Sequence, residues 1–181
     1  MIKKISKLSI LLLVIFLVSG CGSKDVDIVN TSTKKGKTAD NGNQNINVNG
    51  SGQLKCYRNA DAYSGLTADL KYYVTYEKGY MLILHSVEKI SGDNQEALDE
   101  YEDAYNKIKE KYKDLQYYDF NVTRDKNSVT CDININYTKV DTKKIIEIET
   151  DSMFDSKNRP VLKKWLEKGK ERGLVCEGVI E

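Results

Sequence analysis

The chain has 181 residues, with 28 basic side chains against 27 acidic ones, and 40% of its residues are hydrophobic. This length suits one ordinary domain and is too short for two comfortable ones. The near-neutral charge argues against a nucleic-acid-binding protein, which concentrates basic charge on one face, and the composition is typical of a globular domain.

The N-terminal segment has the composition of a targeting sequence. Lys3, Lys4 and Lys7 precede an almost wholly apolar run over residues 8–18, and no acid occurs there. Eleven helical residues rise only about 16 Å, roughly half of a bilayer core, so a membrane-spanning anchor is the less favoured alternative. A basic segment followed by a short apolar one predicts a secretory signal peptide over 1–20.

The next residues, Val18-Ser19-Gly20-Cys21, resemble the lipobox of bacterial lipoproteins, in which an aliphatic residue and two small residues precede a cysteine. The resemblance implies that a diacylglyceryl group is attached to the Cys21 sulfur and that the chain is cleaved before Cys21. The mature protein is then expected on the extracytoplasmic face of the cell membrane, held in the bilayer by its acyl chains. Cleavage removes three lysines and no acid, which leaves 25 basic and 27 acidic residues.

Residues 21–52 are predicted to form the lipidated N-terminus and a flexible tether. After Cys21 this stretch has no aromatic residue and is dense in Gly, Ser, Thr, Asn, Lys and Asp, so it buries too little apolar surface to offset chain entropy. Ile46 and Val48 alternate with asparagine, which leaves a fragile edge strand as the alternative. One folded domain is then expected over 53–181.

The first predicted elements of this domain are strands. A short strand is expected over 54–58, and strict alternation of apolar and polar residues predicts a half-buried strand over 67–77. Gly79 supplies the left-handed conformation that a three-residue hairpin loop needs. The strand that starts at Tyr80 is apolar on both faces at first, which favours a central position, and it stops at Ser91-Gly92.

A long helix follows. Asp93 is the expected N-cap, and Glu96 stands three residues later, as in a capping box. Apolar residues then recur at steps of three and four, which places one apolar stripe along about five to six turns. The stripe consists of Leu98, Tyr101, Tyr105, Ile108, Tyr112 and Leu115.

The rest of the domain is predicted as a second hairpin and a C-terminal helix. The hairpin spans 117–124 and 128–139, with clean alternation in its second strand. Residues 141–149 are ambiguous between a short helix and a strand. The last helix follows Pro160 and ends at Gly173.

Two hairpins separated by a helix and followed by another helix predict an α+β fold. We expect an antiparallel sheet of about four to five strands with the long helix and the C-terminal helix packed on one face. The order and spacing of residues 66–88, 112–118 and 127–148 resemble the YehR-like family of small lipoproteins, and residues 154–181 depart most from it. Because the family has no established activity, the resemblance implies a fold and a location only.

Three cysteines remain once Cys21 is lipidated. Cys131 lies on the apolar face of its strand, where a free thiol behaves as a small hydrophobe. A Cys56–Cys176 disulfide would join the two ends of the domain and is the favoured pairing, with a Cys56–Cys131 bond and a fully reduced state as alternatives. No cysteine or histidine spacing typical of a zinc site occurs.

No catalytic constellation is evident in the sequence. His85 is the single histidine, and its neighbour Ser86 points to the opposite face of a strand, so the two do not form a nucleophile and base pair. The acidic stretches 99–103 and 147–151 lack the alternating ligands and the glycine turn of a calcium loop. We therefore expect no enzyme activity, no cofactor and no metal site.

The twelve tyrosines are the one unusual feature of the composition. Most are predicted to fill the core, while Tyr57, Tyr63 and Tyr73 are candidates for an exposed contact surface. The favoured function is that of a non-enzymatic lipoprotein module that contacts another protein or an envelope component. A small-molecule or glycan-binding lipoprotein is the alternative, and an envelope hydrolase is the least favoured class.

Overall fold

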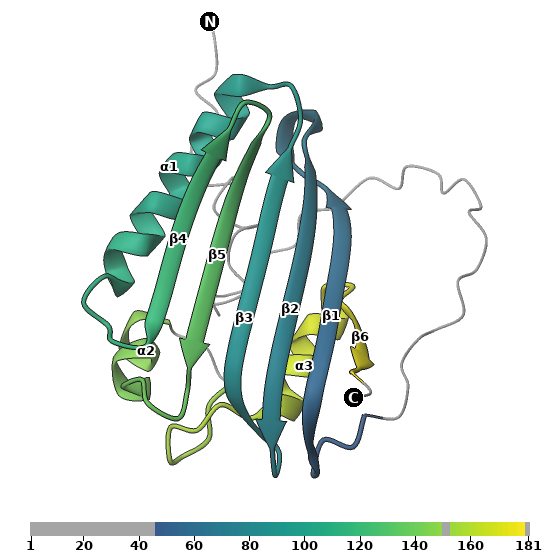
Figure 1. The fold of residues 1–181 in the computed structure, drawn as a ribbon, viewed down its shortest axis with the longest axis vertical. Helices are drawn as coiled ribbons and strands as arrows, with labels where there is room; N and C mark the ends of the chain where they lie inside the picture. Colours follow the sequence, from purple (N-terminus) through teal and green to yellow (C-terminus); the bar gives the residue numbers. More distant parts are fainter. Residues whose placement is uncertain (1–45, 150–152, 180–181) are drawn as a thin grey trace, which may run out of the picture.

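An antiparallel sheet with the strand order β4-β5-β3-β2-β1-β6 forms the body of the protein (Figure 1). The computed structural model describes residues 46–149 and 153–179, so Cys21, the expected signal peptide and most of the expected tether lie outside the described residues. The strands are β1 (Ser51–Asp61), β2 (Thr67–Glu77), β3 (Tyr80–Ser91), β4 (Tyr118–Asp125), β5 (Ser128–Asn136) and β6 (Val175–Gly178). The helices are α1 (Gln95–Tyr112), α2 (Thr142–Ile148) and α3 (Leu162–Glu171), with a short 3-10 turn at Tyr63–Gly65.

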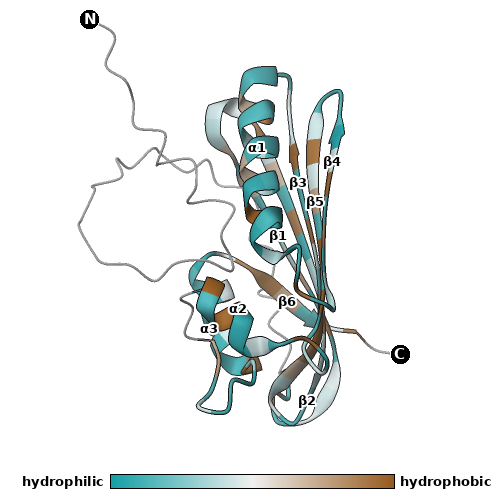
Figure 2. Cartoon of the chain, turned by 90° about the vertical axis from the view of Figure 1, so that its left-hand side faces the viewer, coloured by the Kyte–Doolittle hydropathy of each residue, from teal (hydrophilic) through white to brown (hydrophobic). Residues whose placement is uncertain are grey.

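All three helices lie on the same face of the sheet (Figure 2). Residues on this inner face alternate with residues on the other face, and the alternation is complete in β2, where Ala68, Leu70, Tyr72, Val74 and Tyr76 are buried. The expected α+β class is therefore confirmed, with both predicted helices on one face. We call the opposite face, which no helix of the described chain covers, the open face.

The apolar stripe of α1 holds this helix against β3, β5 and β4. We call it the tyrosine stripe, because three of its residues are tyrosines. Tyr101, Tyr105 and Tyr112 are almost fully buried, and the Tyr112 ring stacks on Tyr118 of β4 with 4.3 Å between the ring centroids. Burying a large side chain of this kind stabilises the fold by about 1.5–3 kcal/mol. The predicted stripe is thus the main contact between the helix layer and the sheet.

The start of α1 differs from the prediction by one residue. Asn94, and not Asp93, is the N-cap, and its side-chain oxygen accepts a hydrogen bond from the Ala97 backbone N–H at 3.1 Å. Asp93 instead accepts a hydrogen bond from the Asn127 side chain at 2.8 Å, which connects the helix entry to the β4–β5 turn. Either side chain satisfies the capping preference, so only the tertiary contact decides between them.

Three further details correct the predicted elements. The sheet has six strands rather than four to five, because Val175–Gly178 forms β6 and pairs with β1. The ambiguous segment 141–149 contains the helix α2, whose N-cap Asp141 accepts a hydrogen bond from the Lys143 N–H. The β2–β3 loop has two residues rather than three, since Lys78 and Gly79 both adopt positive φ angles, the pattern of a tight type I′ hairpin turn.

Ordered structure begins before Gln53. β1 starts at Ser51, and Ile46 and Val48 are partly buried against the core. The Lys78 N–H donates a hydrogen bond to the Gly50 carbonyl at 2.7 Å, which fastens this entry segment to the β2–β3 turn. Residues 46–50 therefore pack as an irregular segment and form neither a free tether nor an edge strand.

A disulfide joins Cys56 of β1 to Cys176 of β6, as the favoured pairing predicts. The two residues are direct cross-strand partners with 4.0 Å between their Cα atoms. Cys131 is free and buried. The bond closes a loop with a sequence separation of 120 residues and attaches a strand of only four residues to the sheet.

Replacing both Cys56 and Cys176 by alanine is expected to lower the free energy of unfolding by about 2–5 kcal/mol, because the unfolded chain regains the entropy of the long loop. Urea denaturation followed by tryptophan fluorescence measures the difference. A reductant should destabilise the natural chain by a similar amount and leave the double variant unchanged. Equal unfolding midpoints for the oxidised natural chain and the variant would contradict the expectation.

Candidate functional site

The open face carries a connected group of exposed apolar side chains at its centre. Tyr57, Tyr73, Ile83 and Val175 retain between 37% and 40% of their accessible surface. Val175 is the cross-strand partner of Tyr57, while Tyr73 lies diagonally from Tyr57 and from Ile83. Diagonal neighbours in a sheet lie within reach of large side chains, so these four residues form one surface, which we call the tyrosine patch.

His85 lies inside this patch. It is the cross-strand partner of Tyr73, and the two rings stack with 5.7 Å between their centroids and 24° between their planes. The His85 Nε2 atom lies 3.0 Å from an Asp132 carboxylate oxygen, and both side chains are partly exposed. Ser86 is buried on the inner face, so the sequence argument against a His85–Ser86 pair agrees with the strand geometry. The arrangement positions an aromatic platform with a polar rim.

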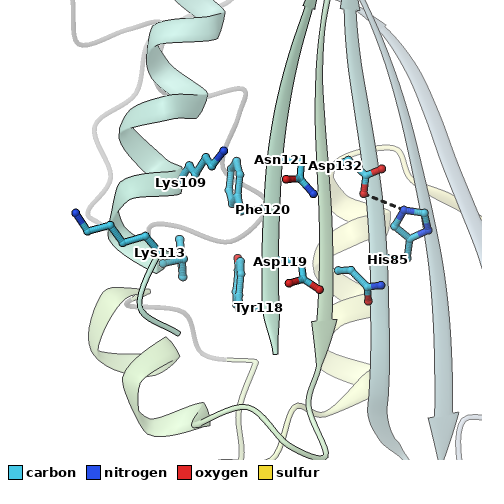
Figure 3. Close-up of a pocket in the computed structure, with 10 residues that line it drawn as sticks. His85, Lys109, Lys113, Tyr118, Asp119, Phe120, Asn121 and Asp132 are labelled. Carbon is cyan, nitrogen blue, oxygen red and sulfur yellow. Dashed lines mark hydrogen bonds and ion pairs between the residues drawn. The ribbon is translucent and has the colours of Figure 1, made fainter. Parts of the chain in front are cut away.

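A shallow depression of about 560 Å³ lies beside the patch, at the outer edge of β4 (Figure 3). Its lining comes from both faces of the sheet. From the helix side come Lys109, Tyr112, Lys113, Tyr118 and Phe120, and from the open face come His85, Asp119, Asn121, Asp132 and Asn134. The depression therefore has one wall on each face of the sheet and surrounds the edge of β4.

Two carboxyl groups are buried on the inner side of the sheet. Burial raises the pKa of Glu88 to about 7, and the nearby Tyr105 hydroxyl and Arg58 offset part of the rise. Burial also raises the pKa of Glu149 to about 8, and the Tyr112 hydroxyl, which donates a hydrogen bond to Glu149 Oε1 at 2.8 Å, opposes it.

Neither buried group has a full set of partners. Oε1 of Glu88 and Oε2 of Glu149 have no hydrogen-bond partner within the described residues, although the Tyr105 hydroxyl is close enough to Glu88 to affect its pKa. Both carboxyls face the helix layer, away from the tyrosine patch. Their protonation therefore acts on stability rather than on the chemistry of the open face.

The structure brings together only some of the residues that the sequence singles out. Tyr57 and Tyr73 lie on the open face, whereas Tyr63 is exposed in the 3-10 turn and belongs to neither surface. Ile83 and Val175 were not expected at the site. The alternation within β3 would have placed Ile83 beside His85, but β6 has no sequence signal that would have placed Val175 there.

Two features are absent from the part of the chain that the structure describes. In residues 46–149 and 153–179, no group of three or more His, Cys, Asp or Glu side chains is arranged to hold a metal ion. None of the helices in this same part of the chain is long and apolar enough to cross a membrane.

One solved structure shares this fold at low sequence identity. The NMR structure of the E. coli YehR protein matches with a TM-score of 0.54 and 16% identity, over 74% of this chain and 95% of that one. The chain has a YehR-like fold. An NMR structure of a protein from Streptococcus pneumoniae TIGR4 matches with a TM-score of 0.43 and 12% identity, over 88% of this chain and 100% of that one. No protein-family model and no curated protein matches the chain.

The free energy of unfolding is expected to fall as the pH rises from about 5 to about 8. The folded state binds the protons of Glu88 and Glu149 more tightly than the unfolded chain, whose carboxyl pKa is near 4.5, so unfolding releases protons in this window. The contribution of Glu88 alone is on the order of 3 kcal/mol. Chemical denaturation at each pH measures the slope.

Glu88→Gln is the decisive variant for this pH dependence. It keeps the shape of the side chain and removes the titrating proton, so its stability should depend less on pH between about 5 and 7 than that of the natural chain. Glu100→Gln, at an exposed position of α1, is the matched control and should keep the natural slope. Stability that rises toward pH 8 in the natural chain would contradict the argument.

Proposed function

We propose that this chain is a membrane-anchored extracytoplasmic lipoprotein whose folded domain is a non-enzymatic module for contact with another protein or an envelope component. The tyrosine patch is the observation that carries the proposal. Tyrosine is enriched in protein interfaces because it offers a large apolar ring with a polar tip at low entropic cost. Here two such rings stand in the middle of a sheet face that the described helices leave uncovered.

Two features support the proposed location. The Val18-Ser19-Gly20-Cys21 sequence has the residue types of a lipoprotein cleavage and acylation site. The Cys56–Cys176 disulfide fits an oxidising compartment outside the cytoplasm, where such bonds form and persist. The anchor and the disulfide together favour a domain that works on the outer side of the membrane.

The geometry of the open face supports binding rather than catalysis. The His85–Asp132 pair has the form of an oriented base, yet the Tyr73 ring stacks on His85 and Ser86 lies on the other side of the sheet. Catalysis by such a pair needs a nucleophile or a water held within hydrogen-bond reach of the imidazole in a defined pocket. A shallow, open surface is better suited to a large partner.

The stack of Tyr73 and His85 also favours one alternative, a glycan ligand. Sugar rings pack on exposed aromatic faces, and the neighbouring Asp132 and Asn134 side chains offer hydrogen-bonding groups for hydroxyls. The proposal of a protein partner is preferred because the patch extends over four strands and includes the aliphatic residues Ile83 and Val175, more apolar breadth than a sugar ring covers.

A photo-crosslinking amino acid at position 73 should capture a partner in intact cells, because this position lies at the centre of the patch. The same amino acid at Asp103, exposed on α1, is the control and should give no specific adduct. Tyr57→Asp should remove the adduct formed from position 73. Absence of any adduct under all growth conditions would argue against a protein partner, and a higher melting temperature with a soluble glycan would then favour the alternative.

Metabolic labelling with a fatty-acid probe should mark the chain, and Cys21→Ala should remove both the label and the membrane association. The thiol of Cys21 is the proposed acceptor of the lipid, so no other cysteine can replace it. Cys131→Ala is the matched control, since this thiol is buried in the core, and it should keep the label. Label retained in the Cys21→Ala variant would contradict the proposed anchor.

A further inference from the structure

The two edges of the sheet are unlike each other. At one edge the short strand β6 pairs with β1 and is fixed there by the Cys56–Cys176 bond. At the other edge β4 is the last strand, and within the described residues nothing pairs with its outer side (Figure 1). α1 covers the inner face of β4 but not its edge.

The hydrogen bonds to β5 show which backbone groups of β4 point outward. The Asn136 N–H donates to the Tyr117 carbonyl at 3.0 Å, so in this register the even-numbered residues of β4 turn their N–H and C=O groups away from β5. The Tyr118 N–H is taken by the Leu115 carbonyl at 3.3 Å. The backbone groups of Phe120 and Val122 and the Tyr118 carbonyl are left for an incoming strand.

β4 lacks several of the usual devices that prevent such pairing, although it carries the charged residues Asp119, Arg124 and Asp125. Exposed edges are commonly blunted by proline, lysine or a bulge, and β4 contains no proline, no lysine and no register shift. Arg124 covers only the C-terminal end of β4. There its guanidinium donates a hydrogen bond to Gln95 at 2.8 Å and another to Asp99 at 3.3 Å. The open part of the edge runs from Tyr118 to Val122.

The depression around β4 has the form that an added strand requires. Side chains of a strand alternate between the two faces, and the depression has one wall on each face (Figure 3). The helix-side wall carries Lys109 of α1 and Lys113, the C-cap residue that directly follows this helix. Lys109 forms no ion pair with any described residue, and Lys113 pairs only with the exposed Glu110.

We propose that the β4 edge binds an extended acidic peptide segment of another protein as a seventh strand, with its acidic side chains directed toward Lys109 and Lys113. Main-chain hydrogen bonds to Phe120 and Val122 supply affinity, and the two lysines select the partner. A second copy of this chain is a poorer occupant, since its β4 carries no acidic side chain on the helix side that could face Lys109 and Lys113. This site adjoins the tyrosine patch at His85 but is built on β4 and its own backbone groups, and it does not depend on the membrane anchor.

The test uses the full chain in detergent and a capped peptide of about nine residues that alternates glutamate with threonine. NMR titration should shift the amide signals of Phe120 and Val122. The same peptide with lysine in place of glutamate should bind at least about tenfold more weakly, because its charges then face Lys109 and Lys113.

Three variants separate the contribution of the β4 backbone hydrogen bonds from that of the two lysines. Val122→Pro removes an outward N–H that β5 does not use, so it should abolish binding and leave the sheet intact. Lys109→Glu combined with Lys113→Glu should weaken binding of the glutamate peptide by at least about tenfold and restore binding of the lysine peptide. Lys111→Glu, on α1 but outside the depression, is the matched control and should change neither affinity.

Several results would overturn the proposal. These are no binding of the glutamate peptide at millimolar concentration, equal affinities for the two peptides, and shifts confined to the tyrosine patch. Shifts at Phe120 and Val122 that depend on protein concentration without peptide would assign the edge to self-association instead. Because Lys113 is exposed and Lys109 partly exposed, changing both to glutamate should not unfold the sheet. This pair of changes keeps the test decisive even if Val122→Pro does unfold it.

Discussion

The packing of α1 and α3 on a single face of the sheet is the constraint from which the rest of the molecule follows. The tyrosine stripe of α1 covers β3, β5 and β4, while Trp165 of α3 packs edge-on against Tyr72 of β2, with 5.7 Å between the ring centroids. Together the two helices cover the inner face along both halves of the sheet. Since all helices of the described chain lie on the inner face, the open face and the β4 edge are left uncovered by them.

The same packing brings polar atoms into the core. The tyrosines of the core supply apolar area but also carry hydroxyl groups inward. Those of Tyr101 and Tyr105 in α1, of Tyr118 in β4 and of Tyr137 have no hydrogen-bond partner within the described residues. Two buried carboxyls accompany them, one accepting a hydrogen bond from Tyr112. A buried polar group without a partner costs roughly 1–3 kcal/mol, so this core gives up stability that an all-aliphatic core would keep. Because the two buried carboxyls, Glu88 and Glu149, have raised pKa values, the stability of the fold depends on pH.

Local periodicity allowed most of the fold to be predicted from the sequence. The alternation in β2 and β5 and the three-and-four spacing in α1 specify both the element and its buried side. β6 was missed because four residues containing Glu177 and Gly178 show no period. The sequence also did not predict that β4 lies at the edge of the sheet. This position depends on which strands pair across the helix crossover and not on any residue within β4. The candidate surfaces depend on that order, so sequence alone identified Tyr57 and Tyr73 but not the patch.

The covalent link between the first and last strands has a mechanical consequence. Force that reaches the domain from its N-terminal side acts first on the residues that precede Cys56, and at Cys56 it meets the covalent bond to Cys176. From that residue the load divides between the backbone of β1 and the disulfide, which carries part of it into β6. A domain held at one end and pulled by a bound partner would therefore resist extension without needing a larger core.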